Sequence, residues 1–206
     1  MSSAEQPQYH TVDEYLGLEE KALTKSEYID GWIRAMAGAS IRHNSIKVNC
    51  LIQLGNRLRG KSCRPFDSDT KLRIERRETR RFYYPDLQVV CQSNDALSIF
   101  QDHPVLIVEV LSPSTRRYDL DEKMTAYLSI PSLEMYLILE QHQPIATVLR
   151  RCEGGFLRQT IEGMGESIEL SFLGFSLPMQ EIYEGIEFTD ECVQEPDPEY
   201  DLTESK

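Results

Sequence analysis

Apolar residues recur at helical spacing in the first part of the chain, and this pattern predicts two helices. Thr11 and Glu14 form a capping box that begins a short helix ending near Leu23. Ser40 can cap a second helix that runs to about Arg59. Its apolar positions lie three and four residues apart and so share one face; they are Val48, Leu51, Leu54 and Leu58.

Between and after these helices the pattern changes to that of strands. Residues 28–33 place Asp-Gly between β-prone residues, which is typical of a hairpin, and Glu27 lies just inside its first strand. Polar and apolar residues alternate along residues 71–75, and residues 82–91 continue with strand-forming residues. The sequence therefore predicts a hairpin followed by further strands.

The next region has the pattern of a strand, a helix and a strand. Residues 104–111 form an apolar strand, and after a Ser-Pro-Ser turn a helix begins near Asp119 and ends before Pro131. Strands follow at residues 133–139 and 145–150. Because two strands joined by a crossover helix run parallel, we predict an α/β fold whose central sheet is mixed and carries additional hairpins.

Length and composition bound the organisation of the chain. The 206 residues, 40% of them hydrophobic, suffice for one domain with a buried core. The last seventeen residues hold seven acidic residues and one basic residue, which is typical of a disordered tail. We therefore expect a flexible N-terminus over residues 1–10, one domain over residues 11–188 and an acidic tail over residues 189–206.

The same composition narrows the cellular setting. No apolar stretch approaches the roughly 20 residues that a membrane span needs, and the N-terminus lacks the features of a signal peptide, so we expect a cytoplasmic protein without membrane contact. The five cysteines contain no Cys-x-x-Cys pair, so we expect them to be reduced and mostly packed. They lie at positions 50, 63, 91, 152 and 192.

Charge is segregated along the sequence. The net charge is −12, yet residues 57–81 contain ten basic and four acidic residues, a local charge of +6. A basic segment in an acidic protein can steer a polyanion to one face, although an exposed basic hairpin would give the same pattern. The predicted phosphate contacts in this segment are Arg57, Arg59, Lys61, Lys71 and Arg73.

A carboxylate in the middle of an apolar strand is the first sign of chemistry. Alternation places Glu109 on the same face as Ile107 and Leu111, with apolar residues on the other face too, so Glu109 should be buried. Burying an unpaired carboxylate costs several kcal/mol, on the order of 3–5. A structural ion pair with an arginine would satisfy it, and so would a metal ion.

Asp86 and Lys123 complete a candidate site. Asp86 follows Pro85 on the preceding strand, and two carboxylates near strand ends can converge on Mg²⁺ or Mn²⁺. Lys123 lies about one turn into the predicted helix, where its ammonium can reach over the end of the Glu109 strand and orient water or stabilise a phosphorane. Tyr127, one turn later, would pack against the site or donate a hydrogen bond to it.

Other residues are weaker candidates. Asp69, near the start of the strand at residues 71–75, and His43, near the start of the second helix, are supporting candidates. Ser112 and Ser114 have no His and Asp partners at a recognisable spacing, which argues against a serine hydrolase. The aromatic residues are too scattered for a single-strand stacking platform.

These residues resemble a known family. Glu27-Tyr-Ile-Asp-Gly, Arg42-His-Asn, Pro85-Asp86 and the run Val108-Glu-Val-Leu-Ser-Pro-Ser-Thr115 with Asp119, Lys123 and Tyr127 are similar to the Uma-type "putative restriction endonuclease" family of the PD-(D/E)XK nuclease superfamily. The resemblance runs from about Thr11 to Glu184. It implies a restriction endonuclease-like fold, a mixed central sheet flanked by helices, and a Mg²⁺-dependent phosphodiester-cleaving site.

The resemblance also implies roles for individual residues. Asp86 and Glu109 would bind the metal together with the backbone carbonyl of Val110, and Glu27 would be an early acidic residue of the same site. The lysine that the superfamily places two residues after the Glu is Leu111 here, so its role would pass to Lys123. If that transfer fails, the site would bind metal but cleave slowly or not at all.

The expected function is endonucleolytic hydrolysis of DNA by a metal-activated water, with a homodimer as the expected assembly because a duplex presents two scissile bonds. RNA or branched DNA are alternative substrates for the same residues. A nuclease-fold module that binds nucleic acid or a protein without cleaving it is the alternative from another class, and the net charge of −12 and the displaced lysine favour it.

Overall fold

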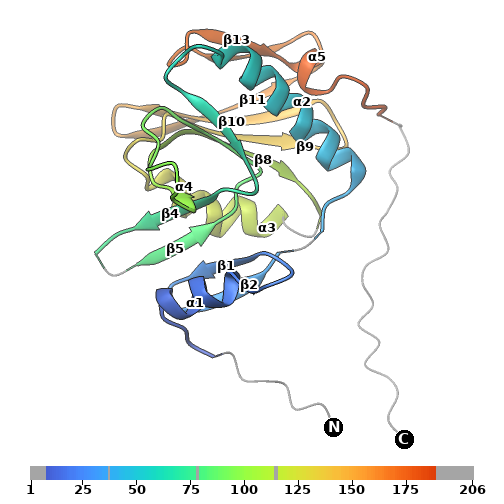
Figure 1. Cartoon of the computed structure of the whole chain (residues 1–206). Helices are drawn as coiled ribbons and strands as arrows, with labels where there is room; N and C mark the ends of the chain where they lie inside the picture. The colour runs from blue at the N-terminus through green and yellow to red at the C-terminus, as the bar shows by residue number, and fades with distance from the viewer. Residues whose placement is uncertain (1–7, 37, 78, 114–115, 189–206) are drawn as a thin grey trace, which may run out of the picture.

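A six-stranded mixed sheet forms the centre of the computed structural model, which describes residues 8–36, 38–77, 79–113 and 116–188 (Figure 1). Its strands, in spatial order, are β11 (Gly155–Glu162), β10 (Ile145–Cys152), β9 (Met135–Glu140), β8 (Pro104–Leu111), β6 (Leu87–Val90) and β3 (Arg64–Asp67). Strands β8 and β9 run parallel, and every other neighbouring pair is antiparallel. The predicted α/β fold, mixed sheet and βαβ unit are confirmed.

A second sheet carries the predicted hairpin. Its strands, in spatial order, are β2 (Trp32–Ala35), β1 (Ser26–Ile29), β5 (Arg80–Tyr83), β4 (Lys71–Glu75) and β7 (Phe100–Gln101), and β12 (Ser167–Leu170) pairs separately with β13 (Phe175–Pro178). The β1–β2 turn has φ of 48° at Asp30 and 103° at Gly31. Positive φ at both central residues matches the right-handed twist of the strands, which explains the Asp-Gly sequence.

Helices cover both faces of the six-stranded sheet. These helices are α2 (Ile41–Leu58), α3 (Arg116–Tyr118), a π-helical turn η1 (Asp119–Lys123), α4 (Met124–Leu128) and α5 (Met179–Ile182), whereas α1 (Val12–Glu19) packs against β1 and β5 of the second sheet. Figure 1 shows α2 on one side of the sheet and the α3–α4 segment on the other. Leu106, Val108 and Val110 of β8 face α2, whereas Ile107 and Leu111 face α4, as the alternation predicted.

The buried face of α2 matches the predicted one at Leu51, Leu54 and Leu58 but differs from it at Val48. Ile46, Cys50, Leu54 and Leu58 are buried, whereas Val48 is 45% exposed. The buried residues are four positions apart and pack against β8 and its neighbours. Val48 was assigned to the wrong face because its spacing to Leu51 also fits a helical period, and only the tertiary contacts distinguish the two choices.

The two faces of α2 allow a matched stability test. We expect Ile46→Val to lower the free energy of unfolding by about 0.5–1.5 kcal/mol, because the lost methylene leaves a gap in a fully buried site. Ile52→Val makes the same change at a 50% exposed position of the same helix and should stay within about 0.5 kcal/mol of wild type. Urea denaturation measures both values, and equal losses would contradict this packing of α2.

Two predicted elements are broken where the site lies. The strand predicted over residues 82–91 is two strands, β5 and β6, in different sheets, with the break at Tyr84-Pro85-Asp86. Pro85 has no N–H for the sheet ladder, so a continuous strand would lose a hydrogen bond there. The helix predicted from Asp119 starts at Arg116 and contains the π-helical turn η1 before α4. Such turns are rare and occur often at functional sites.

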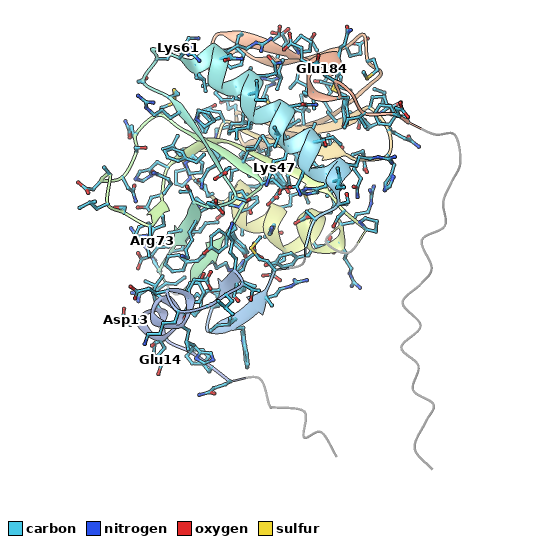
Figure 2. The ribbon with its side chains drawn as sticks, turned by 45° about the vertical axis from the view of Figure 1, so that its right-hand side comes forward. Asp13, Glu14, Lys47, Lys61, Arg73 and Glu184 are labelled. Atoms are coloured by element: carbon cyan, nitrogen blue, oxygen red, sulfur yellow. A yellow bond between two sulfur atoms is a disulfide. The ribbon has the colours of Figure 1, made fainter. Side chains whose placement is uncertain are left out.

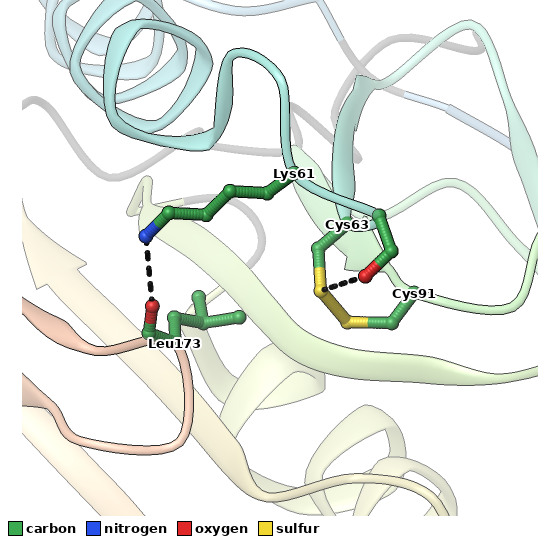
Figure 3. Close-up of a disulfide and its surroundings, with 5 residues drawn as sticks. Lys61, Cys63, Cys91 and Leu173 are labelled. Carbon is green, nitrogen blue, oxygen red and sulfur yellow. Dashed lines mark hydrogen bonds between the residues drawn. A yellow bond between two sulfur atoms is a disulfide. The ribbon is translucent and has the colours of Figure 1, made fainter.

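The expectation that all cysteines are reduced is wrong. Cys63 and Cys91 form a disulfide between the start of β3 and the end of β6 (Figure 3). The antiparallel register that pairs Arg64 with Val90 brings the two cysteines opposite each other. A separation of 28 residues gives no sequence signal for this pairing. Cys50 is free and buried, Cys152 is free and exposed, and Cys192 lies outside the described residues.

The terminal predictions fall partly outside the described structure. Residues 1–7 of the expected flexible N-terminus and all of residues 189–206 lie outside it. Thr11 caps α1 as predicted, with the reciprocal Glu14 hydrogen bond to the Thr11 backbone. Within the described part of the chain, none of the helices has the length and apolar character needed to cross a membrane.

Candidate active site

The predicted site residues line a cleft of about 570 Å³ beside the carboxyl end of β8. Leu87 pairs with Val108, and because β6 and β8 are antiparallel, Asp86 lies next to Glu109. Strand β1 brings Glu27 to the same cleft, and η1 brings Lys123. Four residues chosen from separate parts of the sequence therefore meet in one place.

Asp86 is held by backbone and side-chain contacts. Its Oδ2 accepts a hydrogen bond from the Val110 N–H at 2.8 Å, and Nε2 of His43 lies 3.1 Å from the same oxygen. Its own N–H donates to Oε2 of Glu109 at 3.1 Å. Burial alone would raise the pKa of Asp86, but the His43 contact, the Val110 N–H and Lys123 together lower it. Asp86 is therefore kept ionised in a largely buried position.

Glu109 is buried as predicted and is fully hydrogen-bonded. Its Oε1 accepts from Lys123 Nζ at 3.2 Å and from the Tyr127 hydroxyl at 2.9 Å. Burial raises the pKa of Glu109 well above its ordinary value; Lys123 opposes this rise, and the nearby carboxylates of Asp119 and Asp86 add to it. Glu109 therefore depends on Lys123 to hold a negative charge in this buried position.

Lys123 is the central cation of the cleft floor. Its Nζ lies 3.2 Å from Glu27, 3.2 Å from Glu109 and 3.4 Å from Asp119. Burial would lower the pKa of Lys123, but the attraction of these carboxylates outweighs burial and raises the pKa well above its ordinary value. The lysine thus stays charged although only 6% of it is exposed.

Glu27 is anchored from two sides. Its Oε2 accepts from the Tyr118 hydroxyl at 2.9 Å, and its Oε1 accepts from the Tyr84 N–H at 3.3 Å. Asp119, which the sequence did not single out for a role, joins the same group through Lys123. Its spacing of four residues before Lys123 was the available signal, since such residues share one helix face.

The donor set of this cleft fits a hard divalent cation. On the cleft floor three carboxylates contact Lys123 and Asp86 adjoins them, so four carboxylates outnumber the two basic groups there, Lys123 and His43. In an extended strand the N–H and C=O of one residue point to the same side, so the Val110 carbonyl is directed to the side of Asp86. Two carboxylates and one carbonyl suit Mg²⁺, which keeps several waters and needs few protein ligands.

The structure does not provide a closed protein cage for such an ion. Within the described ranges, no three His, Cys, Asp or Glu side chains are arranged to hold a metal by themselves. The carboxyl of Glu109 is instead engaged by Lys123 and Tyr127. Water and substrate oxygens would therefore have to complete the coordination, as is usual for Mg²⁺ at phosphate-processing sites.

The supporting candidates separate into two groups. His43 and Tyr127 contact Asp86 and Glu109 directly, so the structure brings both to the site. Asp69 is not brought there: its side chain is 76% exposed and forms an ion pair with Lys25. Its position in the turn before β4 directs it to the surface.

The basic segment is spread over distant parts of the molecule. Arg57 pairs with Glu181 at 2.5 Å, and Lys61 donates to the carbonyl of Leu173 at 3.2 Å. Figure 2 shows Lys61 at the upper end of the molecule and Arg73 far below it, with Lys47 between them.

The remaining predicted contacts are also dispersed. Arg73 pairs with Asp102 at 2.8 Å, and Arg59 is exposed just after α2. Lys71 is largely buried beside the ring of Tyr84, which itself lines the cleft. Of the five residues, Lys71 is therefore the one closest to the cleft by its contacts.

Sequence reasoning missed several basic residues that line the cleft. Lys25, Lys47 and Arg34 lie on its walls, and Arg34 stacks on the Tyr118 ring with its guanidinium carbon 3.7 Å from the centroid. These residues come from α2, β2 and the loop before β1, and they form no charge run. The only signal for Lys47 was its spacing of four residues after His43, which places both on one face of the helix.

Comparison with solved structures supports the class of fold. A crystal structure described as "a putative nuclease belonging to DUF820" from Anabaena variabilis matches with a TM-score of 0.69 and 17% sequence identity, covering 84% of this chain and 97% of that chain. At this identity the match shows the fold alone, an α/β fold with mixed sheets and few flanking helices that this chain shares with that structure.

Sequence comparison identifies the family. Residues 12–180 match the Uma2 model, described as "Putative restriction endonuclease", and the chain belongs to this family. Protein slr1290 of Synechocystis is 34% identical over 177 residues, or 85% of this chain and 92% of the relative. Protein sll1609 of the same organism is 37% identical over 134 residues, or 64% and 75%. The resemblance inferred from the motifs is confirmed.

Proposed function

We propose that this chain is an endonuclease that hydrolyses DNA phosphodiester bonds with the help of Mg²⁺ or Mn²⁺. One observation carries the proposal: Asp86 and Glu109 adjoin on the floor of a cleft, where the carboxylates outnumber the one lysine that they surround. Such a site is stabilised by a divalent cation and by the anionic substrate that the cation attracts. The family membership and the nuclease-like fold support the same reaction class.

Each residue has a role that follows from its contacts. Asp86, Glu109 and the Val110 carbonyl would hold the cation, which would supply an activated water and offset charge on the phosphate. His43 fixes the Asp86 carboxylate, and Tyr127 fixes that of Glu109. Because each of these contacts already restrains one carboxylate oxygen, the carboxylate loses less conformational entropy when the cation binds.

Lys123 and Glu27 form the second part of the machinery. Lys123 is held between Glu27 and Glu109, where its positive charge offsets the negative charge of these carboxylates and attracts an approaching phosphate. Glu27 orients Lys123 and is itself fixed by Tyr118. A duplex presents two scissile bonds, one on each strand, so we propose that two copies of the chain act together.

The test combines cleavage with metal-dependent stability. Wild type is incubated with supercoiled plasmid, linear duplex, single-stranded DNA and RNA in Mg²⁺, Mn²⁺ or a chelator, beside Asp86→Asn. We expect metal-dependent cleavage that falls at least about 100-fold in the variant, because metal stabilisation of the transition state is worth several kcal/mol. Metal at about 100 times its Kd should also stabilise wild type by about 2.7 kcal/mol, but not the variant.

The outcomes separate the two classes of function. An equal thermal shift in wild type and Asp86→Asn would place the metal elsewhere and overturn the site. Metal binding at Asp86 without cleavage of any substrate would favour the noncatalytic nuclease-fold module, for which the engagement of Lys123 by three carboxylates is the supporting observation. Cleavage of RNA alone would change the substrate but keep the site.

A further inference from the structure

Lys25 and Lys47 line one wall of the cleft, and Lys71 lies against the ring of Tyr84, which lines the same cleft; these three lysines are called the lysine wall. Lys25 Nζ donates to the main-chain oxygen of Ser68 at 2.8 Å, and Lys47 Nζ donates to the Ser68 hydroxyl at 3.2 Å. The ammonium groups of Lys25 and Lys71 lie 5.5 and 5.2 Å from the centroid of the Tyr84 ring. Three cationic groups thus surround one serine and one tyrosine.

Positive charge on this wall is incompletely balanced. Asp69 pairs with Lys25, but its side chain is 76% exposed, so solvent screens the pair. Burial lowers the pKa of Lys71, and the repulsion from Lys25 lowers it further, while Glu19 opposes both effects. Like charges held this close are stabilised when an anion lies between them.

The lysine wall adjoins the candidate metal carboxylates. Lys47 follows His43 by four residues of α2, a rise of about 6 Å along the helix, and His43 contacts Asp86 at 3.1 Å. Tyr84 is separated from Asp86 by Pro85 alone and also lines the cleft. A group bound at the wall would therefore lie beside a group bound at Asp86, within the same cleft.

We propose that the lysine wall and the Ser68 hydroxyl bind the phosphate next to the scissile one in the same nucleic-acid strand. This inference rests on the proposed function. The Ser68 oxygen accepts a hydrogen bond from Lys47, which leaves its own proton free to donate to a phosphate oxygen. The substrate must then carry successive phosphodiesters, so it is a polynucleotide and not a mononucleotide or a phosphomonoester.

The salt dependence of DNA binding tests this inference directly. The full chain in chelator is titrated with a short fluorescein-labelled DNA duplex between about 50 and 200 mM salt, and the affinity is followed by fluorescence anisotropy. Each lysine that neutralises a phosphate contributes about 0.9 to the slope of log affinity against log salt concentration. We therefore expect Lys25→Gln and Lys47→Gln each to lower the slope by about 0.9.

Two further variants make the result specific. Lys47→Arg keeps the charge and should keep most of the slope. Arg158→Gln removes one exposed positive charge from β11, at the far edge of the sheet, and should leave the slope unchanged. A slope that is unchanged in Lys25→Gln and Lys47→Gln, or that falls equally in Arg158→Gln, would overturn the lysine wall as a phosphate site.

Cleavage measured in parallel distinguishes this inference from the proposed function. With Mg²⁺ present, Lys47→Gln should raise KM for the duplex more than it lowers kcat, because the lysine binds a phosphate that does not react. Cleavage by wild type with unchanged salt slopes in both lysine variants would reject the wall and keep the nuclease. Lowered slopes without cleavage by wild type in any metal would reject the nuclease and keep the wall as a phosphate-binding surface.

Discussion

Replacing Lys123 with methionine is expected to lower the free energy of unfolding by about 3–5 kcal/mol in metal-free buffer. Lys123 is the cation shared by Glu27, Glu109 and Asp119, all of which are buried. Methionine fills a similar volume but leaves these carboxylates without their positive partner, and breaking a buried ion pair from one side carries this cost. Urea denaturation followed by circular dichroism measures the loss.

A matched substitution and a change of pH make this prediction specific. Lys25→Met removes the cation of a solvent-exposed ion pair with Asp69 and should cost no more than about 1 kcal/mol. Lowering the pH should reduce the stability difference between Lys123→Met and wild type, because protonated carboxyl groups carry no charge for the lysine to neutralise. Where Lys123→Met alone does not fold, Lys123→Met with Glu27→Gln should recover stability, since one unpaired charge is removed. Equal losses in the two single variants would show that Lys123 lies in solvent.

The local sequence is enough to predict the strand that carries Glu109. Its alternation predicts which residues share each face, and both faces are apolar, so the buried position of the carboxylate follows from pattern alone. The hairpin before α2 was equally predictable, because Asp30 and Gly31 adopt positive φ that few other residue pairs tolerate. Local conformational preferences decide both elements.

Long-range pairing could not be predicted in the same way. The break at Pro85, which sends β5 and β6 into different sheets, depends on which strands find partners, and the sequence shows only that a proline is present. The Cys63–Cys91 disulfide depends on the β3–β6 register for the same reason. Val48 of α2 was misassigned because Ile46 and Val48 both fit a helical period, and only contact with β8 separates them.

The candidate site was predictable in its acidic part and not in its basic part. Asp86 and Glu109 lie at ends of neighbouring strands, and a buried carboxylate calls for a partner, so sequence and family resemblance point to the same pair. A run of basic residues suggested the phosphate contacts, yet Arg57 and Lys61 lie at the end of α2 away from the cleft. Lys47 is an isolated lysine in the sequence and reaches the cleft only because α2 packs across the sheet.

Replacing Glu109 with glutamine is expected to abolish cleavage while the metal-free protein keeps its stability to within about 1 kcal/mol. The amide oxygen can still accept from Lys123 and Tyr127, so only the hydrogen bond from the Asp86 N–H is lost. Removing one carboxylate also relieves repulsion in a cleft where the pKa of Glu109 is raised by burial and by nearby acids. Cleavage should fall at least about 100-fold, because the neutral amide is a poor ligand for Mg²⁺.

Glu140→Gln provides the matched control for this loss. Glu140 ends β9, directly beside the end of β8, and pairs with Arg116 at 2.7 Å outside the cleft. The same chemical change there should leave cleavage and the metal-dependent rise in melting temperature intact. Glu109→Gln should lose both, and added metal should therefore widen the stability difference between it and wild type by about 2.7 kcal/mol at 100 times the Kd. A Glu109→Gln protein that still cleaves, or that metal still stabilises, would remove Glu109 from the metal site and leave its burial to be explained by the ion pair with Lys123 alone.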